Sequence, residues 1–200
     1  MLWVMMEAAT IWAVWCVVHS LLAAAWFKRL LEQRLGTRYG FYRLAYNVFS
    51  VITVVPVAYL QWSLKGPAVL AWRGPWIAAA VLINVAATVL FVAGARAFDL
   101  ADFLGFRGAG AALRGVPWRE DGGMQEYGIL RWMRHPWYAG AILVLWGHNL
   151  DAAGIAASAA LTAYLLVGAW LEERKLLVVF GHAYREYRRR VPAFYPRRPR

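Results

Sequence analysis

Five long runs of apolar residues divide the chain, and shorter polar or charged segments separate them. A helix needs about 20 predominantly apolar residues to cross the hydrocarbon core of a bilayer, and each run approaches that length. The pattern predicts an all-α integral membrane protein with five transmembrane helices, over residues 2–27, 44–62, 76–98, 133–150 and 155–171. We expect a single domain over residues 1–200, with a three-helix N-terminal part at 1–98.

After the fifth run, the continuous apolar stretch gives way to an apolar stripe on a basic background. Apolar and aromatic side chains return at helical spacing, at Leu176, Leu177, Phe180, Tyr184 and Tyr187. Residues with this spacing share one face of a helix. We therefore expect an amphipathic C-terminal helix that lies along the cytoplasmic face and covers part of it.

The composition agrees with a membrane protein and excludes an ordinary soluble domain. Hydrophobic residues make up 62% of the chain and charged residues only 16%, whereas soluble domains are nearly half apolar and a quarter charged. The chain also contains 12 tryptophans. Many of them flank the apolar runs, where the lipid–water interface favours indole rings.

The basic residues are distributed unevenly between the connecting segments. Of the 22 Lys and Arg residues, 5 fall in residues 28–43, 6 in 96–134 and 9 after residue 171, but only 2 in 63–75. Because cytoplasmic loops carry the excess of Lys and Arg, we expect the N-terminus outside and the C-terminus in the cytoplasm. This topology, with contact to anionic membrane lipids, accounts for the net charge of +11. We therefore expect no nucleic-acid partner.

Cysteine, histidine and glycine add little chemistry. Cys16 is the only cysteine, and the four histidines are dispersed, so we expect neither a disulfide nor a metal site. Several glycines lie between Gly105 and Gly115, but no strand precedes them as it would in a dinucleotide-binding loop. We expect a flexible cytoplasmic loop there, in a position to cover a pocket.

Unusual polar residues stand at the expected cytoplasmic ends of the last two runs. Arg-His-Pro at 134–136 opens the fourth run, and Glu-Glu at 172–173 closes the fifth. A carboxylate at this depth is costly unless it is paired or belongs to a functional site; a solvated helix end is the alternative. The short connection at 151–154 keeps the two helices adjacent. We therefore expect one pocket, suited to a zwitterionic sulfonium nucleoside and lined by Arg134, His135, Tyr138, Glu172 and Glu173.

The same stretches resemble a known superfamily. GILRWMRHPWYAG, followed after one further run by EERKLLVVFGHAYREYRRRVPAFYP, is similar to the isoprenylcysteine carboxyl methyltransferase and phospholipid methyltransferase superfamily, over about residues 127–196. The resemblance implies an integral membrane methyltransferase that uses S-adenosylmethionine. It assigns cofactor binding to Gly128, Leu130, His135, Pro136, Tyr138, Glu172 and Glu173. Catalysis is expected of Arg134, which would favour a thiolate acceptor, and of Glu173, which would deprotonate an amine.

The N-terminal half resembles the NnrU branch of this superfamily, in the stretch HSLLAAAWFKRLLEQRLGTRYGFYRLAYNVFS. That branch is associated with denitrification genes and is similar to methanethiol S-methyltransferases. Helical spacing places Arg43, Tyr46 and Asn47 on one face, with His19 at a similar depth. We expect the methyl acceptor to bind at His19, Arg43, Tyr46 and Asn47. The alternative is that His19 and Asn47 only hydrogen-bond to each other.

These features together predict an S-adenosylmethionine-dependent methyltransferase of the bacterial inner membrane. Its acceptor would be a small thiol or a lipophilic prenylcysteine or lipid, methylated directly and without a metal or a covalent enzyme intermediate. The residues leave thiol, carboxylate and amine acceptors open. The alternative is a non-enzymatic accessory membrane protein of a respiratory or denitrification system. A transporter is disfavoured because the chain shows no inverted repeat.

Overall fold

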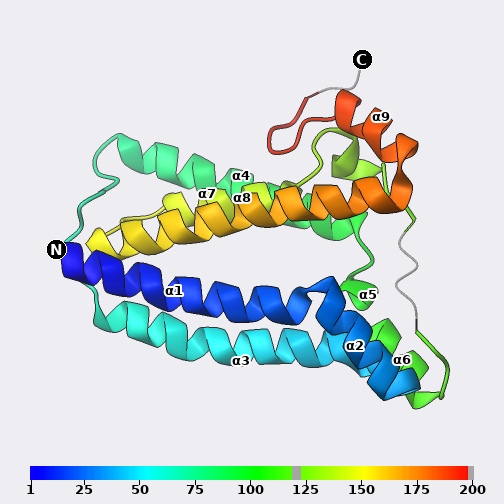
Figure 1. The fold of residues 1–200 in the computed structure, drawn as a ribbon. Coiled ribbons are helices and arrows are strands. Elements are labelled where there is room, and N and C mark those ends of the chain that lie inside the picture. The colour runs from blue at the N-terminus through cyan, green and yellow to red at the C-terminus, as the bar shows by residue number, and fades with distance from the viewer. Residues whose placement is uncertain (119–122, 198–200) are drawn as a thin grey trace.

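The computed structural model describes residues 1–118 and 123–197, and the regular elements of these residues are helices (Figure 1). In chain order they are α1 (Leu2–Ala23), α2 (Ala25–Leu35), α3 (Tyr42–Ser63), α4 (Trp76–Ala97), α5 (Leu100–Leu104), α6 (Phe106–Leu113), α7 (Pro136–Trp146), α8 (Ala152–Phe180) and α9 (His182–Arg190). Short 3₁₀ turns, η1 (Gly36–Phe41) and η2 (Gly128–Arg131), lie before α3 and α7. The all-helical fold class is confirmed.

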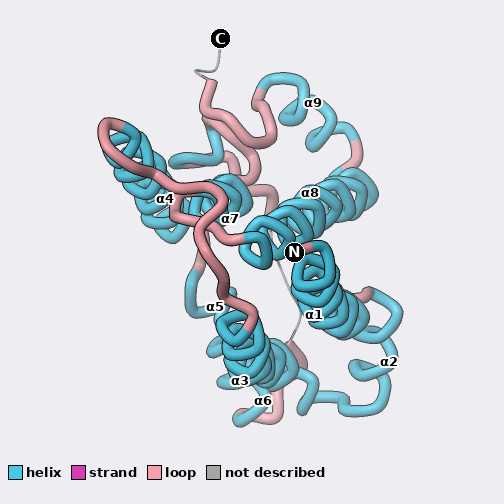
Figure 2. The backbone as a smooth tube through the Cα atoms, turned by 90° about the vertical axis from the view of Figure 1, so that its left-hand side faces the viewer, coloured by secondary structure: helices cyan, strands magenta, loops and turns pink. Residues whose placement is uncertain are grey.

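The long helices lie side by side in the order α3, α1, α8, α7 and α4 (Figures 1 and 2). Helix α8 is central, because it packs against α1 on one side and α7 on the other. Small residues such as Ala8, Ala87, Ala153 and Ala157 are buried between the helices. Small side chains let helix backbones approach closely, which favours association in a bilayer.

Four helical stretches are long and apolar enough to cross a membrane: α1, the run of α2 and α3, α4, and α8. These stretches indicate an integral membrane protein. The fourth expected helix is the exception, because α7 has only 11 residues and is therefore about 16 Å long. We expected five full-length spanning helices, and the described residues contain four helical stretches of sufficient length. A fifth crossing, made by α7 together with its extended flanks, stays a prediction.

The connections gather at two opposite ends of the helix bundle. The N-terminus and the α3–α4 and α7–α8 connections lie at one end, and α2, α6 and α9 lie at the other (Figure 1). At the first end, Leu70 and Leu150 pair through their backbones, and Asp151 caps α8 by accepting from the Gly154 N–H at 2.7 Å. The second end carries the three basic segments. Its location in the cytoplasm stays a prediction.

Two expectations about local structure need correction. A C-terminal helix, α9, is present and buries Tyr184 and Tyr187 of the expected stripe, but the rest of the stripe belongs to α8, which continues to Phe180 before Gly181, with a φ of 53°, turns the chain into α9. The glycine-rich segment after Gly105 is not a loop, because it forms α6. One of its glycines serves close packing: Gly108 of α6 faces Gly40 of η1, and a Cβ on Gly40 would lie 2.3 Å from the Gly108 carbonyl oxygen.

This contact gives a test of the fold. Gly40→Ala should lower the free energy of unfolding by about 1–3 kcal/mol, because the new methyl group overlaps the α6 backbone. Gly110→Ala is the matched control, because a Cβ at Gly110 meets only the flexible end of Arg114, at 3.5 Å. Alanine is also a better helix former than glycine, so the control should be neutral or stabilising by up to about 1 kcal/mol. Thermal unfolding in detergent measures both, and equal stability of the two variants would contradict the packing.

Candidate functional site

The Arg-His-Pro segment is the start of α7. Pro136 occupies the first helical position, where its fixed φ is suitable and its missing N–H is no loss. His135 takes the N-cap position, with a φ of −124° and a ψ of 63°. Arg134 and His135 thereby reach α8 from the side.

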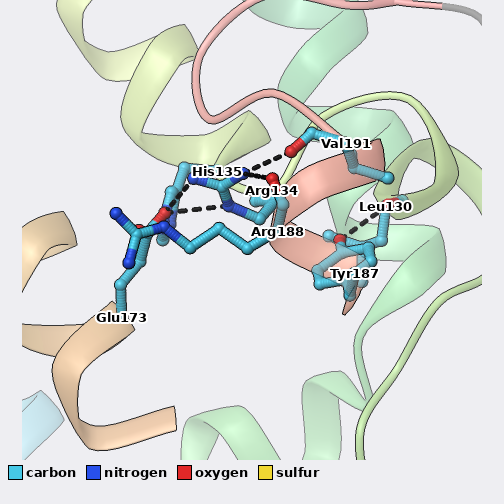
Figure 3. Close-up of polar contacts among 7 residues, drawn as sticks. All are labelled: Leu130, Arg134, His135, Glu173, Tyr187, Arg188 and Val191. Carbon is cyan, nitrogen blue, oxygen red and sulfur yellow. Dashed lines mark hydrogen bonds and ion pairs between the residues drawn. The ribbon is translucent and has the colours of Figure 1, made fainter. Parts of the chain in front are cut away.

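Glu173 of α8 receives these side chains (Figure 3). Its Oε1 accepts from Arg134 Nε at 2.8 Å and Arg134 Nη2 at 2.5 Å, and it lies 3.1 Å from His135 Nε2. Because a carboxylate only accepts, Nε2 of His135 carries the proton. Arg188 of α9 lies 3.2 Å from the other oxygen, Oε2. The side chains of Arg134 and Glu173 are only 8% and 11% exposed, so the pair holds three elements together in a poorly solvated place.

The C-terminal segment is fastened to the same point. The backbone N–H groups of Arg134 and His135 donate to the carbonyls of Pro192 and Ala193, each at 2.9 Å. The Arg134 guanidinium also donates to the carbonyls of Arg188 and Val191. The Val-Pro tail therefore serves as a backbone partner for the start of α7.

Helix α9 covers the site with two tyrosines. Tyr184, Tyr187 and Val191 form a buried cluster that packs on the apolar end of α8. The Tyr187 hydroxyl donates to the Leu130 carbonyl at 2.7 Å, which fixes η2 beneath α9. Burial, followed by the nearby Glu173 charge, raises the pKa of Tyr184 to about 12, so its hydroxyl keeps its proton at neutral pH.

Beside this cluster lies a cavity of about 320 Å³, a volume within the usual range of small-molecule sites. Four of the residues expected to bind the cofactor or to act in catalysis line it: Leu130, Arg134, His135 and Glu172. Glu173 lies behind them and holds Arg134 and His135. Gly128, Pro136 and Tyr138 are not among the lining residues; Tyr138 packs edge-on against His135, with ring centroids 5.3 Å apart.

The sequence did not indicate the opposite wall of the cavity. It is formed mainly by the segment around α5 and by the residues before η2, among them Phe98, Asp102, Phe103, Met124 and Gln125. Among the described residues, three that line the cavity each have a buried polar atom without a hydrogen-bond partner: Asp102 Oδ1, Gln125 Oε1 and Tyr184 Oη. Buried polar atoms are nearly always partnered in folded proteins. Their gathering around one cavity therefore indicates a polar ligand.

A second cavity of about 200 Å³ lies beside the first. Its lining includes Lys28, Arg43, Tyr46, Asn47 and Phe103. Arg43 and Phe103 also line the first cavity, so these two side chains border both spaces. Three of the four residues expected to bind the acceptor thus surround one space.

His19, the fourth, lines neither cavity. It is only 2% exposed, and its Nδ1 donates to the Trp15 carbonyl at 2.7 Å while Nε2 lies 3.4 Å from the Thr53 hydroxyl. Asn47 instead donates to the Phe103 and Leu104 carbonyls at the end of α5. The two side chains therefore have separate partners, and His19 joins α1 to α3.

The fold and site describe a helical membrane protein with a polar pocket at the basic end of its bundle. The model of the NnrU protein family matches residues 7–196, and the chain belongs to this family, which confirms the resemblance. It is 30% identical over 192 residues to the Methanethiol S-methyltransferase of Mycobacterium tuberculosis, covering 92% of this chain and 74% of that protein. It is 32% identical over 190 residues to Methanethiol S-methyltransferase 2 of Bradyrhizobium diazoefficiens, covering 92% and 70%. No solved structure matches significantly.

The ion pair makes a stability prediction. Glu173→Gln should lower the free energy of unfolding by about 3–5 kcal/mol, because it leaves a buried Arg134 without its carboxylate. Glu186→Gln removes an α9 carboxylate that pairs with Arg189 at 3.3 Å on the surface, and should cost less than about 1 kcal/mol. Unfolding of both variants under identical conditions measures the difference. Similar losses in both would mean that Glu173 does not organise the site.

Proposed function

We propose that the protein is a membrane methyltransferase that transfers a methyl group from S-adenosylmethionine to a small thiol. The observation that carries this proposal is the larger cavity, in which the Arg-His-Pro start of α7, Glu172 and three unpartnered polar atoms converge. The names of the two relatives, both methanethiol S-methyltransferases, support this reaction class and this kind of acceptor.

The residues of the larger cavity fit the methyl donor. A zwitterionic nucleoside offers hydroxyl and amino donors, a carboxylate and an apolar ring system. Glu172 would accept from its donors, and His135 would face its polar groups. Phe98, Leu176 and Phe180 supply apolar contacts for the ring. When bound, S-adenosylmethionine supplies a methyl group already activated by its sulfonium.

The protein's part in the reaction is placement. The methyl group needs an acceptor sulfur in line with its bond to the sulfonium, and fixed alignment is worth a large share of such a barrier. The second cavity shares Arg43 and Phe103 with the first. An acceptor held in the second cavity would therefore approach the methyl donor past these two side chains. The thiolate is the nucleophile, and the Arg43 guanidinium near the junction would favour it over the thiol. The Arg134 and Glu173 contacts suit positioning, and their catalytic roles stay predictions.

A lipophilic acceptor remains a second candidate because of the surface around the second cavity. Large apolar side chains of α1 and α3, such as Val18, Leu21 and Val48, are exposed on the outside of these helices, so an acceptor dissolved in lipid would meet this part of the protein. A non-enzymatic accessory role, which the NnrU family also accommodates, predicts no turnover with either kind of acceptor.

The function is tested with purified full-length protein, labelled S-adenosylmethionine, and a panel of small thiols, prenylcysteines and lipids. Wild-type protein should methylate a thiol, and His135→Ala should weaken binding of S-adenosylmethionine by about 1–3 kcal/mol, because it removes a polar contact of the cavity. His148→Ala, at the opposite end of the bundle, should bind normally. No labelled product with any acceptor would contradict the proposed enzyme.

The acceptor site is tested by separating turnover from donor binding. Tyr46→Ala should lower turnover or change the preferred acceptor, while the affinity for S-adenosylmethionine stays within about twofold, under ~0.5 kcal/mol. Tyr59→Ala is the matched control, since Tyr59 lies on the same helix but is 71% exposed. If turnover and preference of Tyr46→Ala equal those of the control, the second cavity does not hold the acceptor.

A further inference from the structure

The two carboxylate oxygens of Asp102 differ in their contacts. Arg43 Nη1 donates to Asp102 Oδ2 at 2.9 Å and to the Asp102 backbone carbonyl at 3.0 Å. Oδ2 is therefore occupied, whereas Oδ1 is buried and has no hydrogen-bond partner among the described residues, and Asp102 is one of the residues that line the larger cavity. Neither the sequence motif nor the proposed transfer assigns this oxygen a role.

The position of Asp102 is fixed from several directions. At the start of α5, Asp99 accepts from the Asp102 N–H at 3.1 Å. At its end, the Asn47 amide donates to the Phe103 and Leu104 carbonyls at 3.2 and 3.0 Å. Gly105, with a φ of 92°, brings α5 so near α3 that a Cβ would lie 2.4 Å from the Leu44 nitrogen. These contacts fix the backbone at Asp102, and the bond from Arg43 to Oδ2 orients the carboxylate.

The chemistry of the unpartnered atoms selects their ligand. Asp102 Oδ1 and Gln125 Oε1 are both acceptors, and they line the same cavity. A buried acceptor without a donor is unfavourable, and more so when it is charged. The missing partner is thus a group with N–H or O–H donors, such as a ribose hydroxyl, an exocyclic amine or an ammonium.

We infer that Asp102 is a recognition residue for the nucleoside in the larger cavity, oriented by Arg43, and that its Oδ1 accepts a hydrogen bond from that ligand. The inference rests on the proposed function, because it takes the methyl donor as the occupant. It also extends the donor site beyond the motif at residues 127–196 to α5 and, through Arg43, to α3. Since Arg43 also lines the second cavity, the residue that orients Asp102 stands between donor and acceptor.

The test is binding of S-adenosylhomocysteine to full-length protein by calorimetry. In Asp102→Asn, the amide oxygen would stay on Arg43, so the amide nitrogen, a donor, would face the donors of the ligand. Affinity should fall about tenfold or more, as expected for loss of a hydrogen bond to a charged group. Glu32→Gln removes one negative charge from exposed α2 and is the matched control, with affinity unchanged.

A second variant and a second ligand complete the test. If Asp102→Asn alone does not fold, the double variant Arg43→Gln with Asp102→Asn replaces it, because it keeps a neutral hydrogen-bonding pair. Its affinity for S-adenosylhomocysteine should fall by the same factor. Binding of 5′-methylthioadenosine, which lacks the ammonium, shows which donor is recognised: a loss for both ligands indicates the ribose or base, and a loss confined to S-adenosylhomocysteine indicates the ammonium.

The outcomes separate this inference from the function on which it rests. If wild-type protein binds and the folded Asp102 variants bind within twofold of it, Asp102 is not a recognition residue, although the proposed function stands. If wild-type protein does not bind S-adenosylhomocysteine at all, the proposed function fails and this inference fails with it.

Discussion

The site depends on one buried ion pair, between Arg134 and Glu173. Their side chains are almost fully enclosed, and a charge enclosed in this way must be paired and hydrogen-bonded to be tolerated. Arg134 satisfies that demand by binding Glu173 and the backbone at Arg188 and Val191. These contacts fix the start of α7, the end of α8 and the C-terminal segment relative to one another. Together the three segments form one wall of the larger cavity.

The opposite wall is held differently, because side chains of α3 bind the backbone of α5. Arg43 and Asn47 bind the backbone of α5, and Gly105 permits close contact. Two halves of the chain that are far apart in sequence thus face each other across a space that neither could enclose alone. Arg43 and Phe103, where these halves join, border both cavities.

Sequence patterns predicted the helices and one wall of the site well. Apolar runs located α1, α3, α4 and α8, because a lipid-facing helix must be apolar along its length. The Arg-His-Pro and Glu-Glu segments were expected to meet, and in the structure they do, because the short α7–α8 connection leaves little freedom. Periodicity could not separate α8 from α9, since the break at Gly181 interrupts the backbone without interrupting the stripe.

The α5 wall escaped prediction for physical reasons. Helix α5 has five residues, too few to show a period, and α6 is stabilised by glycine contacts with η1 that appear only in three dimensions. The role of Asn47 was likewise hidden, because its partners are backbone carbonyls and any residue supplies those. Asp102 gave no signal of its own, because Asp99 lies three residues before it and acidic residues are nearly as frequent as basic ones in this segment.

A structure of the protein bound to S-adenosylhomocysteine is the decisive measurement for the site. The nucleoside should lie between α5, α8 and α9, beside His135 and Tyr184, with the Arg134–Glu173 pair intact behind it. A ligand bound at the opposite end of the bundle, with the cavity at His135 filled only by water, would show that this cavity is not the donor site.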